Sequence, residues 1–178
     1  MLTDRPAQRG VTLIEFLISF AILGILIATA VPSFRDWITN SQVRTAADTV
    51  NSGLQMARTE AVRRNTPVRW TLSNSTGGAW LIDVPSTGAT VQTRSGNEGT
   101  VSALVTSNQN QIVFNGVGWV TPTPVNPIQI DVSNPGAGDC QDAGGGGGPI
   151  RCLRVLVGAG GQVRMCDPVL ASSAAAAC

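Results

Sequence analysis

The chain has 178 residues with 12 basic side chains, all of them arginine, 11 acidic side chains and no histidine. Its near-neutral charge offers no general attraction for nucleic acid, and its length suits one domain with a core plus an appendage. Without histidine, Ser-His-Asp and Cys-His catalysis are excluded, and a zinc site would have only cysteine and carboxylate ligands. The composition therefore favours a protein that is not an enzyme, and we expect neither a cofactor nor a metal.

The most apolar part of the chain is residues 11–31, VTLIEFLISFAILGILIATAV, which carry a single charge at Glu15. A helix of this length spans about 30 Å, the thickness of the hydrocarbon core of a bilayer. Arg5 and Arg9 precede the segment, which predicts a cytoplasmic amino terminus and an exported carboxy-terminal region. The leader before it is mostly polar, so cleavage after Gly10 would leave the apolar helix on the mature protein.

Glu15 is the most informative residue of this segment. A carboxylate inside a membrane span costs roughly 2.5–3.5 kcal/mol and normally has a partner. The span contains no cation, but cleavage after Gly10 would create an amine at Val11, and a neighbouring copy shifted along its axis could bring that amine to Glu15. The alternative is a protonated or snorkelling Glu15 near the membrane interface.

Residues 10–15, GVTLIE, resemble the type IV prepilin signature of a short basic leader, a glycine, a hydrophobic residue, Thr-Leu-Ile-Glu and an apolar helix. The resemblance implies that residues 1–10 are a leader removed by prepilin peptidase after Gly10, and that Val11 is then N-methylated. It assigns Glu15, the fifth mature residue, to assembly. It also implies a single-pass protein of the bacterial inner membrane that joins other pilins in a filament through an inner-membrane assembly platform.

A second helical pattern covers residues 32–65. Pro32 lacks an amide hydrogen and Gly24 is flexible, so we expect the long helix to kink at these positions. Beyond Pro32, apolar residues recur at spacings of three and four, which predicts an amphipathic helix that ends near Asn65. The residues of its apolar stripe are Val43, Ala46, Ala47, Val50, Leu54, Ala57 and Ala61. Off the stripe, Glu60 and Arg64 are four residues apart and are expected to pair.

Short alternating segments separated by turn residues fill residues 66–178. The expected strands are residues 68–72, 79–84, 90–94, 101–105, 111–114, 118–121, 128–132, 153–157 and 162–166. This pattern predicts an antiparallel sheet or a pair of sheets, and with the long helix it gives an α+β fold in which the helix stripe covers a sheet. The glycine-rich stretch 133–149 lacks the Lys-Ser/Thr and the helix of a P-loop, so we expect a flexible loop.

Four cysteines lie in the last third of the chain: Cys140, Cys152, Cys166 and Cys178. No two of them form a Cys-x-x-Cys pair, and the exported side of the membrane is oxidising, so disulfides are favoured over a zinc site. Three connectivities are open. Short loops favour 140–152 and 166–178, and each such loop stabilises the fold by roughly 3 kcal/mol in the chain-entropy model.

Two further stretches narrow the family. Residues 54–64, LQMARTEAVRR, resemble the LxxARxEAxxR helix of the GspH/FimT group, and residues 161–166, GQVRMC, resemble its closing Gly-x-Val-Arg-x-Cys. The resemblance implies a type IV pilin fold, in which a long helix with a transmembrane first half packs on the antiparallel β-sheet of a periplasmic head. It implies a structural subunit, either a FimT/FimU-like minor pilin or the H pseudopilin of type II secretion, and leaves this choice open.

A DNA-binding role in natural transformation is the alternative function. Some FimT-like pilins bind DNA through a Gly-Arg-x-Arg motif, but here Gln162 replaces the first arginine and only Arg164 matches. DNA contact would then depend on Arg164 clustering with Arg154 and Arg151. The competing interpretation places these arginines on a solvated strand face.

Overall fold

A computed structural model describes residues 10–142 and 146–178. The predicted leader up to residue 9, with Arg5 and Arg9, and residues 143–145 of the glycine-rich loop lie outside the described residues. Contacts divide the chain into two compact units, Met1–Arg35 and Asp36–Cys178. The division into functional segments 1–10, 11–31, 32–65 and 66–178 stays a prediction.

The helix α1 spans Leu13–Arg64 and so contributes to both units. It is helical through Gly24 and Pro32, and the kinks expected there stay predictions. Its end is a Schellman motif, in which Asn65 N–H donates to Val62 O (3.2 Å) and Thr66 N–H donates to Ala61 O (3.3 Å). Asn65 has a φ of 49°, a left-handed conformation that asparagine tolerates. The predicted helix end is confirmed.

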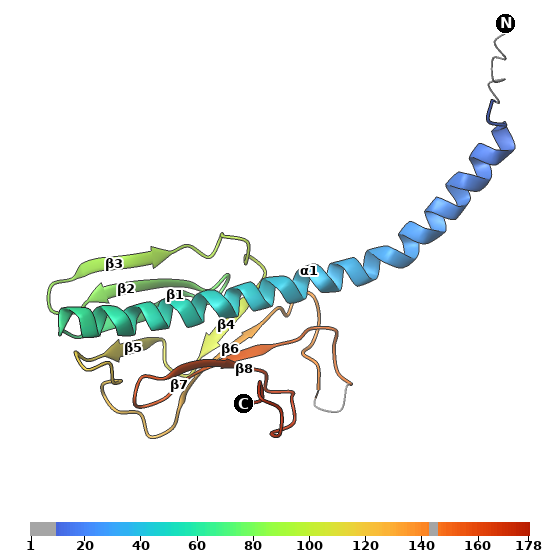
Figure 1. Cartoon of the computed structure of the whole chain (residues 1–178). Helices are drawn as coiled ribbons and strands as arrows, with labels where there is room; N and C mark the ends of the chain where they lie inside the picture. Colours follow the sequence, from blue (N-terminus) through green and yellow to red (C-terminus); the bar gives the residue numbers. More distant parts are fainter. Residues whose placement is uncertain (1–9, 143–145) are drawn as a thin grey trace, which may run out of the picture. The chain divides into compact units, whose positions relative to one another are not determined.

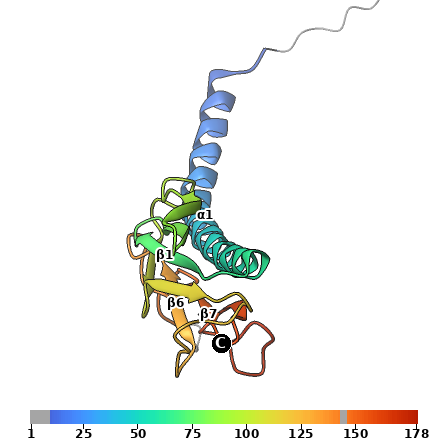
Figure 2. The ribbon, with the colours of Figure 1, turned by 90° about the vertical axis from the view of Figure 1, so that its left-hand side faces the viewer.

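The second unit contains two four-stranded antiparallel sheets beside the second half of α1 (Figures 1 and 2). One sheet has the strand order β3-β2-β1-β5, and the other has the order β4-β6-β7-β8. The strands of the first sheet are β1 (Val68–Asn74), β2 (Ala79–Val84), β3 (Ala89–Arg94) and β5 (Gln111–Phe114). Those of the second are β4 (Leu104–Ser107), β6 (Ile128–Ser133), β7 (Leu153–Val157) and β8 (Val163–Cys166). The predicted α+β fold is confirmed.

The core lies between α1 and the two sheets. All seven residues of the predicted helix stripe are fully buried, and they join one cluster with the inward positions of both sheets. Alternation is clearest in β6, where Ile128, Ile130 and Val132 are buried while the residues between them are partly exposed. Because the same helix stripe packs against both sheets, α1 and the two sheets share one core.

The helix α1 lies close against side chains of the first sheet at Gly53. A Cβ at this position would lie 2.8 Å from Cε2 of Trp80 and 3.1 Å from Nε1 of Trp70. Both indoles are buried, so the missing side chain of Gly53 makes room for two large aromatic rings against the helix backbone.

Two of the predicted strands were placed wrongly. Residues 118–121 form no strand, because Asn115 Oδ1 accepts hydrogen bonds from Val117 N–H (3.1 Å) and Trp119 N–H (2.9 Å) and closes a turn. Only an isolated bridge between Val120 and Phe114 remains there. The strand expected at 101–105 begins later, at Leu104, because the residues before it form a turn.

Both favoured disulfides are present, Cys140–Cys152 and Cys166–Cys178. The second holds the alanine-rich end against β8, where Asp167 N–H also donates to Ala176 O at 2.7 Å. The covalent bond therefore supplies order that this apolar but featureless segment cannot obtain from packing.

We predict that Gly53→Ala lowers the free energy of unfolding by about 1–3 kcal/mol, because the added methyl group overlaps the Trp80 and Trp70 rings. Helix propensity alone predicts the opposite sign, a gain of up to about 1 kcal/mol. Urea denaturation of the full chain in detergent measures the change. Ser52→Ala, at the exposed neighbouring position, is the control. A Gly53→Ala protein as stable as the parent would show that the helix is free to move away.

We predict that Glu60→Gln lowers the free energy of unfolding at pH 7 by about 0.5–1 kcal/mol. Hydrogen bonds from Arg63 and Arg64 lower the pKa of Glu60 from 4.5 to about 2. The carboxylate therefore contributes its full stabilisation above the unfolded pKa and loses it as the pH falls towards 2. Parent and variant should differ at pH 7 and converge near pH 2 in urea titrations; a constant difference would contradict this assignment.

Candidate assembly site

The amino-terminal end of α1 is a capped helix start. Thr12 Oγ1 accepts a hydrogen bond from Glu15 N–H (3.3 Å), and Thr12 O accepts one from Phe16 N–H (3.2 Å). A threonine cap followed three residues later by glutamate is the spacing of a capping box. This role of Thr12 was not expected from the Thr-Leu-Ile-Glu motif, although the Thr-x-x-Glu spacing alone indicates it.

The Glu15 carboxylate lies on the exposed surface of the first turn of α1. Its backbone carbonyl accepts a hydrogen bond from Ser19 Oγ (2.8 Å). Within residues 10–142 and 146–178, the ion pairs join other side chains and none involves Glu15. The helix start favours a negative charge, but in this part of the chain no cation neutralises it.

The first half of α1 exposes apolar side chains on every face. Exposure is 78% at Leu13, 56% at Phe20 and 59% at Leu26, and α1 is long and apolar enough to cross a membrane. An apolar surface of this extent must be covered by lipid or by other apolar helices. Glu15 is therefore a charge at the edge of a surface that excludes water.

The three arginines considered for DNA contact each have a partner in the second unit. Arg151 Nε pairs with Asp167 Oδ2 (2.6 Å), and Arg154 Nε pairs with Asp131 Oδ1 (2.6 Å). Arg164 donates to the backbone carbonyls of Ala177 (3.3 Å) and Cys178 (3.0 Å). Two of the charges are thus neutralised, and the DNA-binding alternative gains no support from this geometry.

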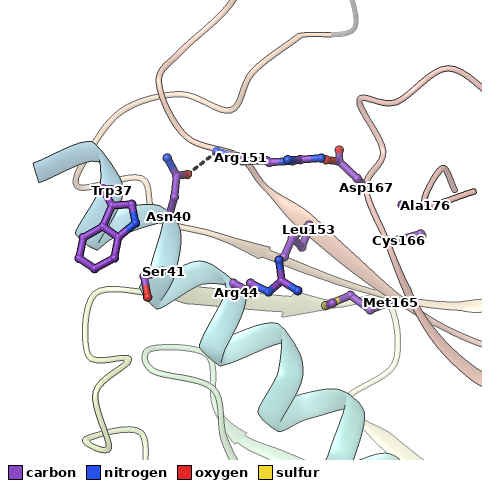
Figure 3. A pocket seen from close by; sticks show the side chains of 10 residues that line it. All are labelled: Trp37, Asn40, Ser41, Arg44, Arg151, Leu153, Met165, Cys166, Asp167 and Ala176. Carbon is purple, nitrogen blue, oxygen red and sulfur yellow. Dashed lines mark hydrogen bonds and ion pairs between the residues drawn. The ribbon is translucent and has the colours of Figure 1, made fainter. Parts of the chain in front are cut away.

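Arg151 borders a cavity of about 440 Å³ between α1 and the carboxy-terminal segment (Figure 3). Asn40 on α1 accepts a hydrogen bond from Arg151 N–H (2.7 Å) and donates one to Pro149 O (3.3 Å). Figure 3 shows the Arg151 side chain extending from there to Asp167. These bonds connect the helix to both disulfide-bonded segments, and they account for the position of Arg151 without a ligand.

Arg58 joins the two motifs that suggested the family. Its Nε donates to Gly118 O (3.1 Å) and its Nη2 donates to Gly160 O (3.4 Å). Gly160 belongs to the turn between β7 and β8, directly before the GQVRMC stretch. Gly161 in the same turn has a φ of +75°, and a Cβ there would overlap Gly118 O. Both motifs are recognisable in the sequence, but these hydrogen bonds are not, because only folding brings the residues together.

The family model described as Type II transport protein GspH matches residues 46–169, more than half of the chain. The protein belongs to the GspH family. The prokaryotic N-terminal methylation motif matches residues 5–31, which contain Gly10, Val11 and Glu15. The GspH-family chain is therefore type IV pilin-like, and proteins of this kind are structural subunits.

Relatives of the GspH-family chain include fimbrial proteins. One from Pseudomonas aeruginosa is 35% identical over 107 residues, which are 60% of this chain and 65% of that protein. One from Moraxella nonliquefaciens is 49% identical over 49 residues, 28% of this chain and 31% of that protein. The chain thus spans less than two thirds of the length of these curated relatives.

The fold of the GspH-family chain is similar to the crystal structure of the type IV minor pilin FimU of Pseudomonas aeruginosa. The match has a TM-score of 0.54 at 16% identity and covers 70% of this chain and 88% of FimU. At this identity the similarity shows the fold alone, and it confirms the expected pilin fold.

We predict that Arg58→Met lowers the free energy of unfolding by about 1–3 kcal/mol, because two carbonyl groups of separate turns lose a charged donor. Urea denaturation of the full chain in detergent measures it. The matched control is Arg44→Met on the same helix, where the side chain is 74% exposed; a change within about 0.5 kcal/mol is expected there. Equal effects of the two substitutions would contradict the role of Arg58.

Proposed function

We propose that this protein is a minor pilin or pseudopilin that is cut after Gly10 by prepilin peptidase, N-methylated at Val11 and assembled into a type IV pilus or type II secretion pseudopilus. Before assembly it waits in the bacterial inner membrane. Arg5 and Arg9 hold its amino terminus in the cytoplasm, and the β-rich head lies in the periplasm. Its partners are the peptidase, the inner-membrane assembly platform and the other pilins of the filament.

The observation that carries this proposal is a carboxylate without a counter-ion on a water-excluding helix. Glu15 has no cationic partner among the described residues, and the other residues from Leu13 to Ile18 are apolar and exposed. Cleavage after Gly10 creates an amine four residues before Glu15, on the same helix start. In a single chain, this amine and the Glu15 carboxylate are two opposite charges at the edge of the membrane. In a filament, the amine of one copy meets Glu15 of the next.

The apolar helix changes its surroundings from lipid to neighbouring helices during assembly. Both surroundings are apolar, so the hydrophobic effect differs little between them. Close packing and the Glu15–amine ion pair therefore favour transfer of the helix from lipid into the filament. This argument applies equally to a pilus and to a pseudopilus, because both would use the same processed helix.

We predict that Glu15→Gln reduces incorporation into filaments by about tenfold or more. A charge-assisted hydrogen bond contributes about 1.5–3 kcal/mol to binding, and the neutral amide of glutamine cannot form one with the amine. The measurement is the ratio of the protein in sheared filaments to that in the membrane fraction. Membrane insertion and cleavage should be unchanged, since Gly10 and the apolar helix are intact.

The control for this experiment is Glu98→Gln, the same substitution at an exposed residue of the head. It removes only the ion pair with Arg94 and should leave incorporation unchanged. The mass of the mature protein supplies an independent test, because processing predicts a chain that begins at Val11 and carries one added methyl group. Normal incorporation of Glu15→Gln, or a native protein that retains residues 1–10, would overturn the proposed function.

A further inference from the structure

An exposed apolar patch and an unbalanced positive charge lie side by side near the end of α1. We call this the tryptophan surface and define it by Arg58, Val62, Val117, Trp119 and Gln162. Gly118 connects its members, because its carbonyl accepts from Arg58 and a Cβ there would lie 3.0 Å from Cγ2 of Val62. Nothing in the proposed assembly through Glu15 uses this surface.

Two exposed apolar side chains of this surface, Trp119 and Val117, lie on a turn whose backbone is fixed by hydrogen bonds. Trp119 is 57% exposed and Val117 is 70% exposed. The Asn115 side chain accepts hydrogen bonds from both of their N–H groups, and Asn115 N–H donates to Trp119 O (2.8 Å). A binding residue on an ordered backbone turn loses less entropy when it binds, and tryptophan is enriched among the residues that contribute most to the energy of protein interfaces.

The charge of the surface comes from Arg58. Its partners among the described residues are two neutral carbonyls, which leaves further guanidinium N–H donors. It lines a cavity of about 310 Å³ together with Gln55, Thr59, Gln162 and Val163, none of which is charged. Glu60, two residues further along α1, is paired with Arg63 and Arg64. A carboxylate entering this cavity would therefore complement it in charge and in hydrogen bonding.

We propose that the tryptophan surface binds the head of a neighbouring pilin-type subunit through an apolar segment that carries an aspartate or glutamate. The apolar side chains of the partner cover Trp119 and Val117, and its carboxylate enters the cavity to reach Arg58. The identity of the partner rests on the proposed function, whereas its chemistry follows from this surface. The contact fixes how heads are arranged after the Glu15 helix has entered the filament.

Three substitutions in the full chain, expressed in cells that assemble the filament, test this proposal. Trp119→Ala removes the largest contact and should lower incorporation about tenfold or more. Gln162→Glu places a negative charge beside Arg58 and should lower it similarly, whereas Gln162→Arg should not. The matched control is Val125→Ala, since Val125 is 98% exposed in the same loop. Because Gln162 is exposed, its variants keep the test valid even if Trp119→Ala misfolds.

A photoreactive amino acid at position 117 identifies the partner. Capture of a pilin-type subunit from position 117, and its absence from position 125, supports the proposal. Normal incorporation of both Trp119→Ala and Gln162→Glu overturns it, and if Glu15→Gln is still excluded from filaments, the proposed function survives that failure. Salt-sensitive DNA binding by the detergent-solubilised chain that Trp119→Ala abolishes, with incorporation unchanged, also overturns it and assigns the surface to DNA.

Discussion

One stripe of small and aliphatic side chains on α1 holds both sheets of the head to the same helix. Alanines at positions 46, 47, 57 and 61 and the bare backbone at Gly53 bring the helix close to the sheets, and the large side chains Trp70, Trp80 and Phe114 come from the strands. This division of sizes lets the side chains of the strands pack against the helix backbone.

The same helix meets an opposite requirement in its first half. There apolar side chains are exposed all round the helix, so they need lipid or other helices to cover them. Glu15 is the only charged residue between Val11 and Val31, and it lies at the capped start beside Thr12. The second half of the helix is therefore amphipathic and packs in the core of the β-rich head. The first half is apolar on all sides and suits lipid or other apolar helices.

The two motifs that mark the family lie close together in the fold. Arg58, from the helix motif, donates hydrogen bonds to Gly118 and to Gly160, which directly precedes the closing motif. Gly118 and Gly161 have positive φ angles at this close approach. The arginines that looked available for DNA are used differently, because Arg151 and Arg154 pair with Asp167 and Asp131. Arginines in a sequence predict a DNA-binding surface poorly when each of them pairs with another group of the folded protein.

The sequence by itself determined the membrane-length helix, the seven-residue stripe, the end at Asn65 and most strands, because these follow from local periodicity and turn chemistry. It also predicted both disulfides, since short loops are easily closed. Only the tertiary structure decided that residues 118–121 form a turn, that Gly53 faces two indoles, and that Arg58 reaches Gly118 and Gly160. These features depend on side chains brought together from distant parts of the chain, and no local pattern records such encounters.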